Sequence, residues 1–157
     1  MALDLSSVGW VSPTSTFSYD WKTLATYALG VGAKRDELSY LYEGTEGGMR
    51  VLPSFAVIPA QAPVGLALDR CKGDLAMIVH GAQTVRLLAP IPDRGTLEST
   101  GTLSAIYDLK RFAQVIVETE TRHQGQLLFE TRWSIIFRND GGFGGPRPPP
   151  DPAPAVP

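Results

Sequence analysis

The sequence has few of the residues that build disulfide-stapled or metal-bound domains. Cys71 is the single cysteine in 157 residues, which excludes an internal disulfide and a thiolate zinc cluster. We therefore expect no metal. One cysteine is compatible with a reducing compartment, and we expect a cytoplasmic location. A peroxisomal location would apply to a eukaryotic source, although the final residues, Ala-Val-Pro, do not form a peroxisomal address.

Charge of one sign and long apolar runs are also missing. The formal net charge is -2, so there is no electrostatic attraction for nucleic acid or for an anionic membrane surface. The most apolar stretch, residues 54–68, is shorter than the ~20 residues of a membrane helix, and Pro59 and Pro63 interrupt it. Residues 1–7 lack the basic and apolar regions of a secretory signal. We expect neither nucleic acid nor membrane as a partner.

The first half of the chain has helical periodicity. Apolar residues recur at helical spacing over residues 18–29, with Ser18 as the expected cap and Gly30 as the stop. Residues 33–51 are polar and contain glycine, which predicts a long loop with a short helical or extended piece at 38–42. Residues 53–69 are apolar on nearly all sides, as in a buried helix, and their prolines predict a kink or two short helices.

The second half changes to a period of two. Residues 78–88, 96–107, 113–122 and 126–137 are strand candidates, joined by short connections. Short connections favour an antiparallel meander. Helices followed by a run of strands predict an α+β domain, with a helix packed on one face of the sheet.

The end of the chain has a different composition. Residues 141–145 are rich in glycine and residues 146–157 are dominated by proline and alanine. Such a segment cannot bury a core and favours an extended polyproline II linker. We therefore expect one folded domain over residues 1–140, followed by a linker or tail over 141–157.

Several strings, in order, resemble one enzyme family. They are Tyr-Ala-Leu-Gly-Val-Gly-Ala at 27–33, Leu-Tyr-Glu-Gly at 41–44, Leu-Pro-Ser-Phe-Ala-Val at 52–57, Val-His-Gly at 79–81 and Gly-Gly-Phe-Gly-Gly-Pro-Arg at 141–147. Together they resemble the amino-terminal half of the MaoC-like, or type 2, enoyl-CoA hydratases. The resemblance implies a hot-dog fold, in which an antiparallel β-sheet wraps around a long central helix.

The family builds a pseudo-dimer from two hot-dog repeats, and the second repeat carries a motif like Asp-x-Asn-Pro-x-His. Its Asp and His act as general base and acid when water adds to a trans-2-enoyl thioester. That motif is absent here: Leu75 stands five residues before His80, and no Asn-Pro separates Glu118 from His123. We therefore predict no catalytic residue in this chain, which alone should be inactive.

The resemblance implies contacts with acyl-CoA at His80, Gly81 and Lys110. Glycine at position 81 would let a ligand approach the backbone closely. The acyl pocket is expected to be lined by Phe55, Val57 and Ile58. Two alternatives without a role in binding remain open: Lys110 could be a solvated turn residue, and His80 could be a structural histidine. We expect Glu118 with Glu120, and His123, to be solvated residues.

The function implied is the amino-terminal half of an (R)-specific 2-enoyl-CoA hydratase of fatty acid β-oxidation. No cofactor is needed, since the CoA thioester is the substrate. The expected partners are a catalytic hot-dog half or a homologous subunit, giving a dimer. The alternative is a non-catalytic acyl-CoA-binding or scaffold subunit of a heteromeric dehydratase. A hot-dog thioesterase is disfavoured, because residues 53–68 contain no carboxylate near the buried helix.

Overall fold

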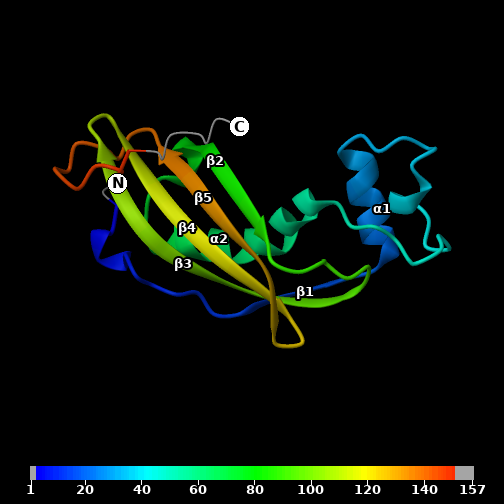
Figure 1. The fold of residues 1–157 in the computed structure, drawn as a ribbon. Helices are drawn as coiled ribbons and strands as arrows, with labels where there is room; N and C mark the ends of the chain where they lie inside the picture. The colour runs from blue at the N-terminus through cyan, green and yellow to red at the C-terminus, as the bar shows by residue number, and fades with distance from the viewer. Residues whose placement is uncertain (1–2, 151–157) are drawn as a thin grey trace.

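The computed structural model of the chain describes residues 3–150, and its centre is a five-stranded antiparallel sheet packed on a helix (Figure 1). The elements are β1 (Ser15–Tyr19), α1 (Trp21–Gly30), α2 (Val57–Arg70), β2 (Ile78–Leu87), β3 (Gly95–Leu109), β4 (Phe112–His123) and β5 (Gln126–Phe137). This arrangement confirms the predicted α+β class. No helix in this part of the chain has the length and apolar character needed to cross a bilayer.

The strand order is β1-β3-β4-β5-β2, with all neighbours antiparallel. Strands β3, β4 and β5 form the predicted meander. The prediction was wrong for β2, which pairs with β5 instead of β3. The physical reason is that β1 pairs with the edge of β3 that β4 leaves free, which is the position that a simple meander would have given to β2.

The start of the chain also differs from the prediction. Residues 15–19 form β1, and α1 begins at Trp21. Asp20, and not Ser18, caps the helix, because its carboxylate accepts from the backbone N–H of Lys22 at 3.0 Å and of Thr23 at 3.2 Å. The Ser18 hydroxyl instead lies 2.8 Å from that of Thr96 on β3. The predicted helix began too early because Ser18, two residues before the actual cap, is itself a favourable capping residue.

Helix α2 is continuous although it contains prolines. A 3₁₀ turn over Pro53–Ala56 leads directly into α2, so the segment predicted as a kinked helix or two short helices is one uninterrupted helical unit. Pro59 lies in the first turn, where a backbone N–H has no partner within the helix. Pro63 lies inside the helix and is buried against the sheet. Gly101 of β3 allows this approach, because a Cβ there would lie 3.1 Å from Pro63 Cβ.

Two apolar clusters divide the interior. The first lies between α2 and the middle of the sheet and includes Val64, Leu103, Val117 and Trp133. The second surrounds Phe55 and joins α1 and the following loop to the far end of the sheet. Figure 1 shows α1 and its loop beside one end of the sheet, while α2 runs under the strands. The domain is therefore a central helix-on-sheet body with a lateral lobe.

The glycine-rich segment after β5 is held against the body. The Asp108 carboxylate accepts from the backbone N–H groups of Gly142 at 2.9 Å and Gly144 at 2.6 Å, while the Asp108 N–H donates to the Pro146 carbonyl at 2.8 Å. The predicted domain boundary at residue 140 remains a prediction. Residues 151–157 of the predicted tail lie outside the described residues.

Candidate functional site

Strand β2 forms one edge of the sheet, and it carries two of the predicted site residues. It pairs with β5 on one side, and no strand among residues 3–150 pairs with its other side. Most of its residues are exposed, including the large apolar side chains of Val79 and Leu87. An edge with free backbone N–H and C=O groups is a template for pairing with another chain.

A β-bulge at Gly81 determines which side chains of β2 share a face. His80 pairs with Ile135, Ala82 pairs with Ser134, and Gly81 has no partner on β5. A Cβ on Gly81 would lie 3.2 Å from both the Ser134 carbonyl oxygen and Ile136 Cγ1. Glycine is thus favoured by the fit to β5, and the ligand approach expected from the sequence stays a prediction. The inserted residue places His80 and Gln83 on the same face of the sheet.

That face is the inner face, defined here as the one packed against α2. On it, Trp133 contacts both His80 and a pair of hydrogen-bonded threonines. The His80 imidazole stacks on the Trp133 indole, with ring centroids 5.2 Å apart and planes inclined by 13°. Trp133 is 7% exposed and belongs to the first apolar cluster. Its indole N–H donates to Thr131 Oγ1 at 2.7 Å, and the Thr131 and Thr119 hydroxyls lie 2.7 Å apart. The exposed His80 ring therefore rests on a rigid aromatic surface.

Gln83 pairs with Trp133 across the β2–β5 ladder. Its side-chain nitrogen, Nε2, is buried and has no hydrogen-bond partner among the described residues. Buried polar atoms in folded proteins nearly always have a partner. Sequence reasoning missed both Gln83 and Trp133, because only the strand register reveals that they lie beside His80.

Lys110 lies in the β3–β4 turn, at the same end of the sheet as His80. The register Ile78–Phe137–Ala113 connects the start of β2 to this end. At least two strand spacings of about 4.8 Å separate Lys110 from β2, so the separation is about 10 Å or more. Lys110 is exposed, and its left-handed backbone, with φ of 70°, is fixed by an N–H bond of 2.7 Å to Asp108 Oδ1. The structure places Lys110 at the same end of the sheet as His80, two strands away, and its contact with CoA stays a prediction.

Asp108 organises this turn electrostatically. Backbone N–H donors from Gly142, Gly144 and Lys110 hold the pKa of the Asp108 carboxyl below its usual range, against the opposing effect of desolvation. The carboxylate thus stays ionised and fixes both the turn that carries Lys110 and the segment after β5.

The three expected acyl-pocket residues do not form one wall. Phe55 is completely buried, and its ring lies 5.2 Å from that of Tyr19 and 5.4 Å from that of Tyr27. Ile58 is half-buried against this second cluster, whereas Val57 is half-buried against the first. Phe55 is therefore a core residue of the lateral lobe, while Val57 and Ile58 retain partly accessible side chains.

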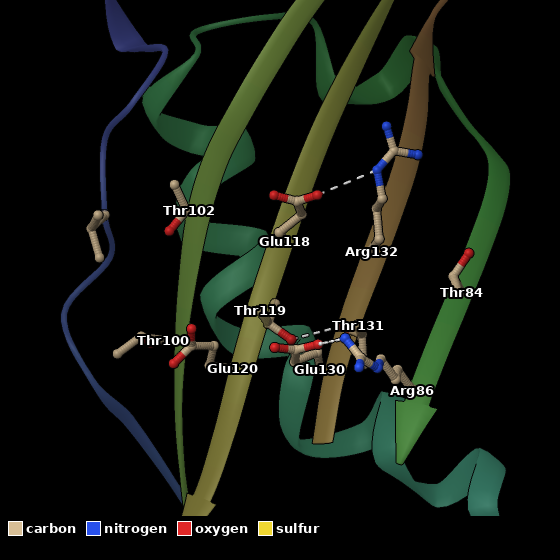
Figure 2. A pocket seen from close by; sticks show the side chains of 11 residues that line it. Thr84, Arg86, Thr100, Thr102, Glu118, Thr119, Glu120, Glu130, Thr131 and Arg132 are labelled. Carbon is tan, nitrogen blue, oxygen red and sulfur yellow. Dashed lines mark hydrogen bonds and ion pairs between the residues drawn. The ribbon is translucent and has the colours of Figure 1, made fainter. Parts of the chain in front are cut away.

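A cavity of about 620 Å³ lies on the outer face of the sheet, away from α2 (Figure 2). Threonines and ion pairs line it, including Glu118–Arg132 and Arg86–Glu130, each at 3.4 Å. Glu118 and Glu120 are exposed there, as the sequence predicted. None of the predicted acyl-CoA residues reaches this cavity, and its exposed, mutually paired charges are typical of a solvated sheet face. We therefore place the candidate site on the inner side of β2.

Other reactive side chains do not form a second site. Burial raises the pKa of the Cys71 thiol, which disfavours a nucleophilic thiolate. His123 is half-buried beside the β4–β5 turn, and its Nδ1 lies 2.9 Å from the Thr96 carbonyl oxygen. His123 was expected to be a solvated residue, but its ring is half-buried and bonded to the backbone. Residues 3–150 contain no cluster of three His, Cys, Asp or Glu side chains suited to a metal ion.

Comparison with known proteins agrees with this geometry. Residues 17–139 match the family described as the MFE-2 hydratase 2 N-terminal domain. The chain is 34% identical to 3-hydroxyacyl-thioester dehydratase Y of Mycobacterium tuberculosis, with 94% of this chain and 52% of that protein covered. It is 31% identical to the peroxisomal enoyl-CoA hydratase 2 of Arabidopsis thaliana, with 87% and 48% covered. The chain thus spans about half the length of these relatives.

Solved structures confirm the hot-dog fold. A MaoC-like dehydratase from Phytophthora capsici superimposes with a TM-score of 0.75 at 22% identity, covering 93% of this chain and 54% of that one. The HadBC (3R-hydroxyacyl-ACP dehydratase) complex of M. tuberculosis contains a chain that superimposes with a TM-score of 0.69 at 16% identity, covering 83% of this chain and 96% of that chain. The protein therefore belongs to the MaoC-like hydratase 2 family and corresponds to its amino-terminal hot-dog domain.

Proposed function

We propose that this chain is the substrate-binding half of an (R)-specific 2-enoyl-CoA hydratase, and that a second hot-dog half supplies the acid–base groups. The observation that carries the proposal is the free β2 edge, where His80 and the Gly81 bulge lie beside Trp133. The substrate class comes from the named activities of the relatives, which include enoyl-CoA hydratase 2 and a 3-hydroxyacyl-thioester dehydratase.

The residues of the chain support this division of labour. Hydration needs a general base and a general acid within reach of one water molecule. Of the two histidines, His80 stacks on Trp133 on the inner face of the sheet, and His123 bonds to the backbone of Thr96. Neither has a carboxylate five residues before it with Asn-Pro between them. Binding and orientation of the thioester are the tasks that remain for these residues.

The β2 edge also supports a partner repeat. Val79 and Leu87 are 46% and 40% exposed, and the strand has unpaired backbone groups along its length. A second hot-dog sheet that pairs with this edge would satisfy those groups and cover the apolar side chains. The same docking would enclose the inner face around His80. We propose that acyl-CoA lies in the resulting cleft, with Lys110 toward the CoA phosphates.

A scaffold subunit of a heteromeric dehydratase is the second candidate. Two neighbours in structure, HadBC and ChsH1–ChsH2 of M. tuberculosis, are complexes of separate chains. The size of the native polypeptide, measured by mass spectrometry, separates the two candidates. A chain covalently continuous with a second repeat supports the first candidate. A stable complex of two separate polypeptides supports the second. The proposed compartment is the cytoplasm, or the peroxisome in a eukaryote.

The test is hydration of crotonyl-CoA by this chain assembled with a hot-dog half that carries Asp-x-Asn-Pro-x-His. We expect 3-hydroxybutyryl-CoA of the R configuration, detected by coupling to an (R)-specific dehydrogenase. His80→Ala should raise KM, whereas Thr84→Val, on the outer face of the same strand, should leave KM unchanged. No turnover by a correctly assembled complex, or a product of S configuration, would contradict the proposal.

A further inference from the structure

Gln83 has a hydrogen-bond donor that the fold itself does not use. Its Nε2 atom is buried and makes no hydrogen bond to any of residues 3–150. Leaving a buried donor unpaired destabilises the fold, because the donor loses its hydrogen bond to water and gains none in return. Such a donor, beside a candidate site, points to a role in binding.

The strand geometry directs this donor to the inner face. Without the bulge at Gly81, residues 80 and 82 would share a face, since side chains alternate along a strand. The bulge instead places Gln83, which pairs with Trp133, on the same face as His80, which pairs with Ile135. Bulges next to active sites commonly re-aim a side chain in this way.

We propose that Gln83 is a substrate-contact residue, whose Nε2–H donates a hydrogen bond to the carbonyl oxygen of the acyl thioester. This inference rests on the proposed function, because it takes the inner side of β2 as the thioester site. A neutral amide N–H matches a neutral carbonyl oxygen, whereas the CoA phosphates favour a charged donor.

A contact with the backbone of a partner repeat is the competing explanation. Pairing at a sheet edge uses backbone groups that lie in the plane of the sheet, whereas the Gln83 side chain extends from the inner face with His80. The geometry therefore favours a ligand on the inner face over a strand that pairs with β2.

Gln114 provides a matched control inside the same domain. Its Oε1 is also buried without a hydrogen-bond partner in the described part of the chain, and its Nε2 donates to Ser134 Oγ at 2.7 Å. Gln114 pairs with Ile136, so it lies on the outer face, away from His80. Gln83→Met and Gln114→Met remove the same chemical group from opposite faces of the sheet. Thermal unfolding of both variants establishes that each remains folded.

The experiment follows the side-chain amide signals of the full chain by ¹H–¹⁵N NMR, with the Gln83 signal assigned from its absence in Gln83→Met. Crotonyl-CoA and free CoA are the two probes, since free CoA lacks the thioester carbonyl. We expect crotonyl-CoA to move the Gln83 signal and free CoA to leave it in place. Gln83→Met should weaken crotonyl-CoA binding about 10-fold, the loss of about one hydrogen bond, and Gln114→Met should not.

The outcomes that overturn the inference are distinct. In the same spectra, a crotonyl-CoA-induced shift of the His80 backbone amide signal without a shift of the Gln83 side-chain signal would refute the Gln83 contact and leave the proposed function standing. An equal response of Gln83 to free CoA would also refute it, by assigning the contact to the CoA moiety. Weaker assembly of Gln83→Met with a catalytic half, at unchanged crotonyl-CoA affinity, would place Gln83 in the interface. No response of any residue to crotonyl-CoA would refute the proposed function and the inference together.

Discussion

Replacing Trp133 tests whether the indole orients His80. Trp133→Phe keeps a ring under the imidazole but loses the indole N–H bond to Thr131, which contributes about 1 kcal/mol. Trp133→Leu loses that bond, the ring stack, worth about 1 kcal/mol, and part of the buried apolar surface. Since truncation of a buried Trp to Ala costs about 3–5 kcal/mol, we expect Trp133→Leu to cost about 3 kcal/mol.

The two variants should separate by chemical denaturation and by NMR. An imidazole stacked on an indole experiences its ring current, so the His80 ring protons should resonate upfield in the wild type. Trp133→Phe should retain most of this shift, and Trp133→Leu should abolish it. Equal unfolding free energies for the two variants, or His80 signals that stay unchanged in Trp133→Leu, would refute the role of Trp133 as the surface that fixes His80.

Three further predictions concern the body and its edges. Backbone donors from Gly142, Gly144 and Lys110 lower the pKa of Asp108 in the folded state. The ionised Asp108 should therefore contribute its full stabilisation above the pKa of an unfolded Asp, about 3.9. This stabilisation should be lost as the pH falls through the pKa of Asp108 in the folded state. Asp108→Asn should therefore lower Tm at neutral pH and flatten the Tm profile in acid, and an unchanged acid profile would contradict this. Gly101→Val should cost about 1–3 kcal/mol in denaturant unfolding, since even a Cβ lies 3.1 Å from Pro63; a neutral effect would show that α2 is not tightly seated. We expect the free β2 edge to pair with a second copy of the chain, so Val79→Lys, which places a charge on that edge, should increase the monomer fraction in gel filtration; an unchanged elution volume would exclude β2 as the contact.

The sequence predicted the strands of the second half well, because their alternating pattern is local. It also predicted the buried helix, but as a kinked helix or two short ones, whereas α2 is continuous and Gly101 of a distant strand makes room for its Pro63. The first strand was missed, because a five-residue strand directly before a helix resembles an extended helix start, with Ser18 as a rival cap to Asp20. This error arose where two local signals compete, whereas the pairing of β2 with β5 was missed because strand order is not a local property of the sequence.

The candidate site was less predictable than the fold. His80 and Gly81 were found through a family resemblance, and their role in binding stays a prediction. Gln83 and Trp133 were not found, because a bulge changes which residues share a face and only the pairing with β5 reveals it. The docking of residues 142–146 on Asp108 was also missed, since its hydrogen bonds join residues more than thirty positions apart.

The most direct test of the account is where the chemistry resides. Crotonyl-CoA hydration would be measured for this chain alone, for the chain assembled with a motif-bearing hot-dog half, and for the same assembly with the motif Asp replaced by Asn. We predict turnover only in the second sample. Turnover by the isolated chain, or by the assembly with the substituted motif, would contradict the assignment of this domain as the binding half.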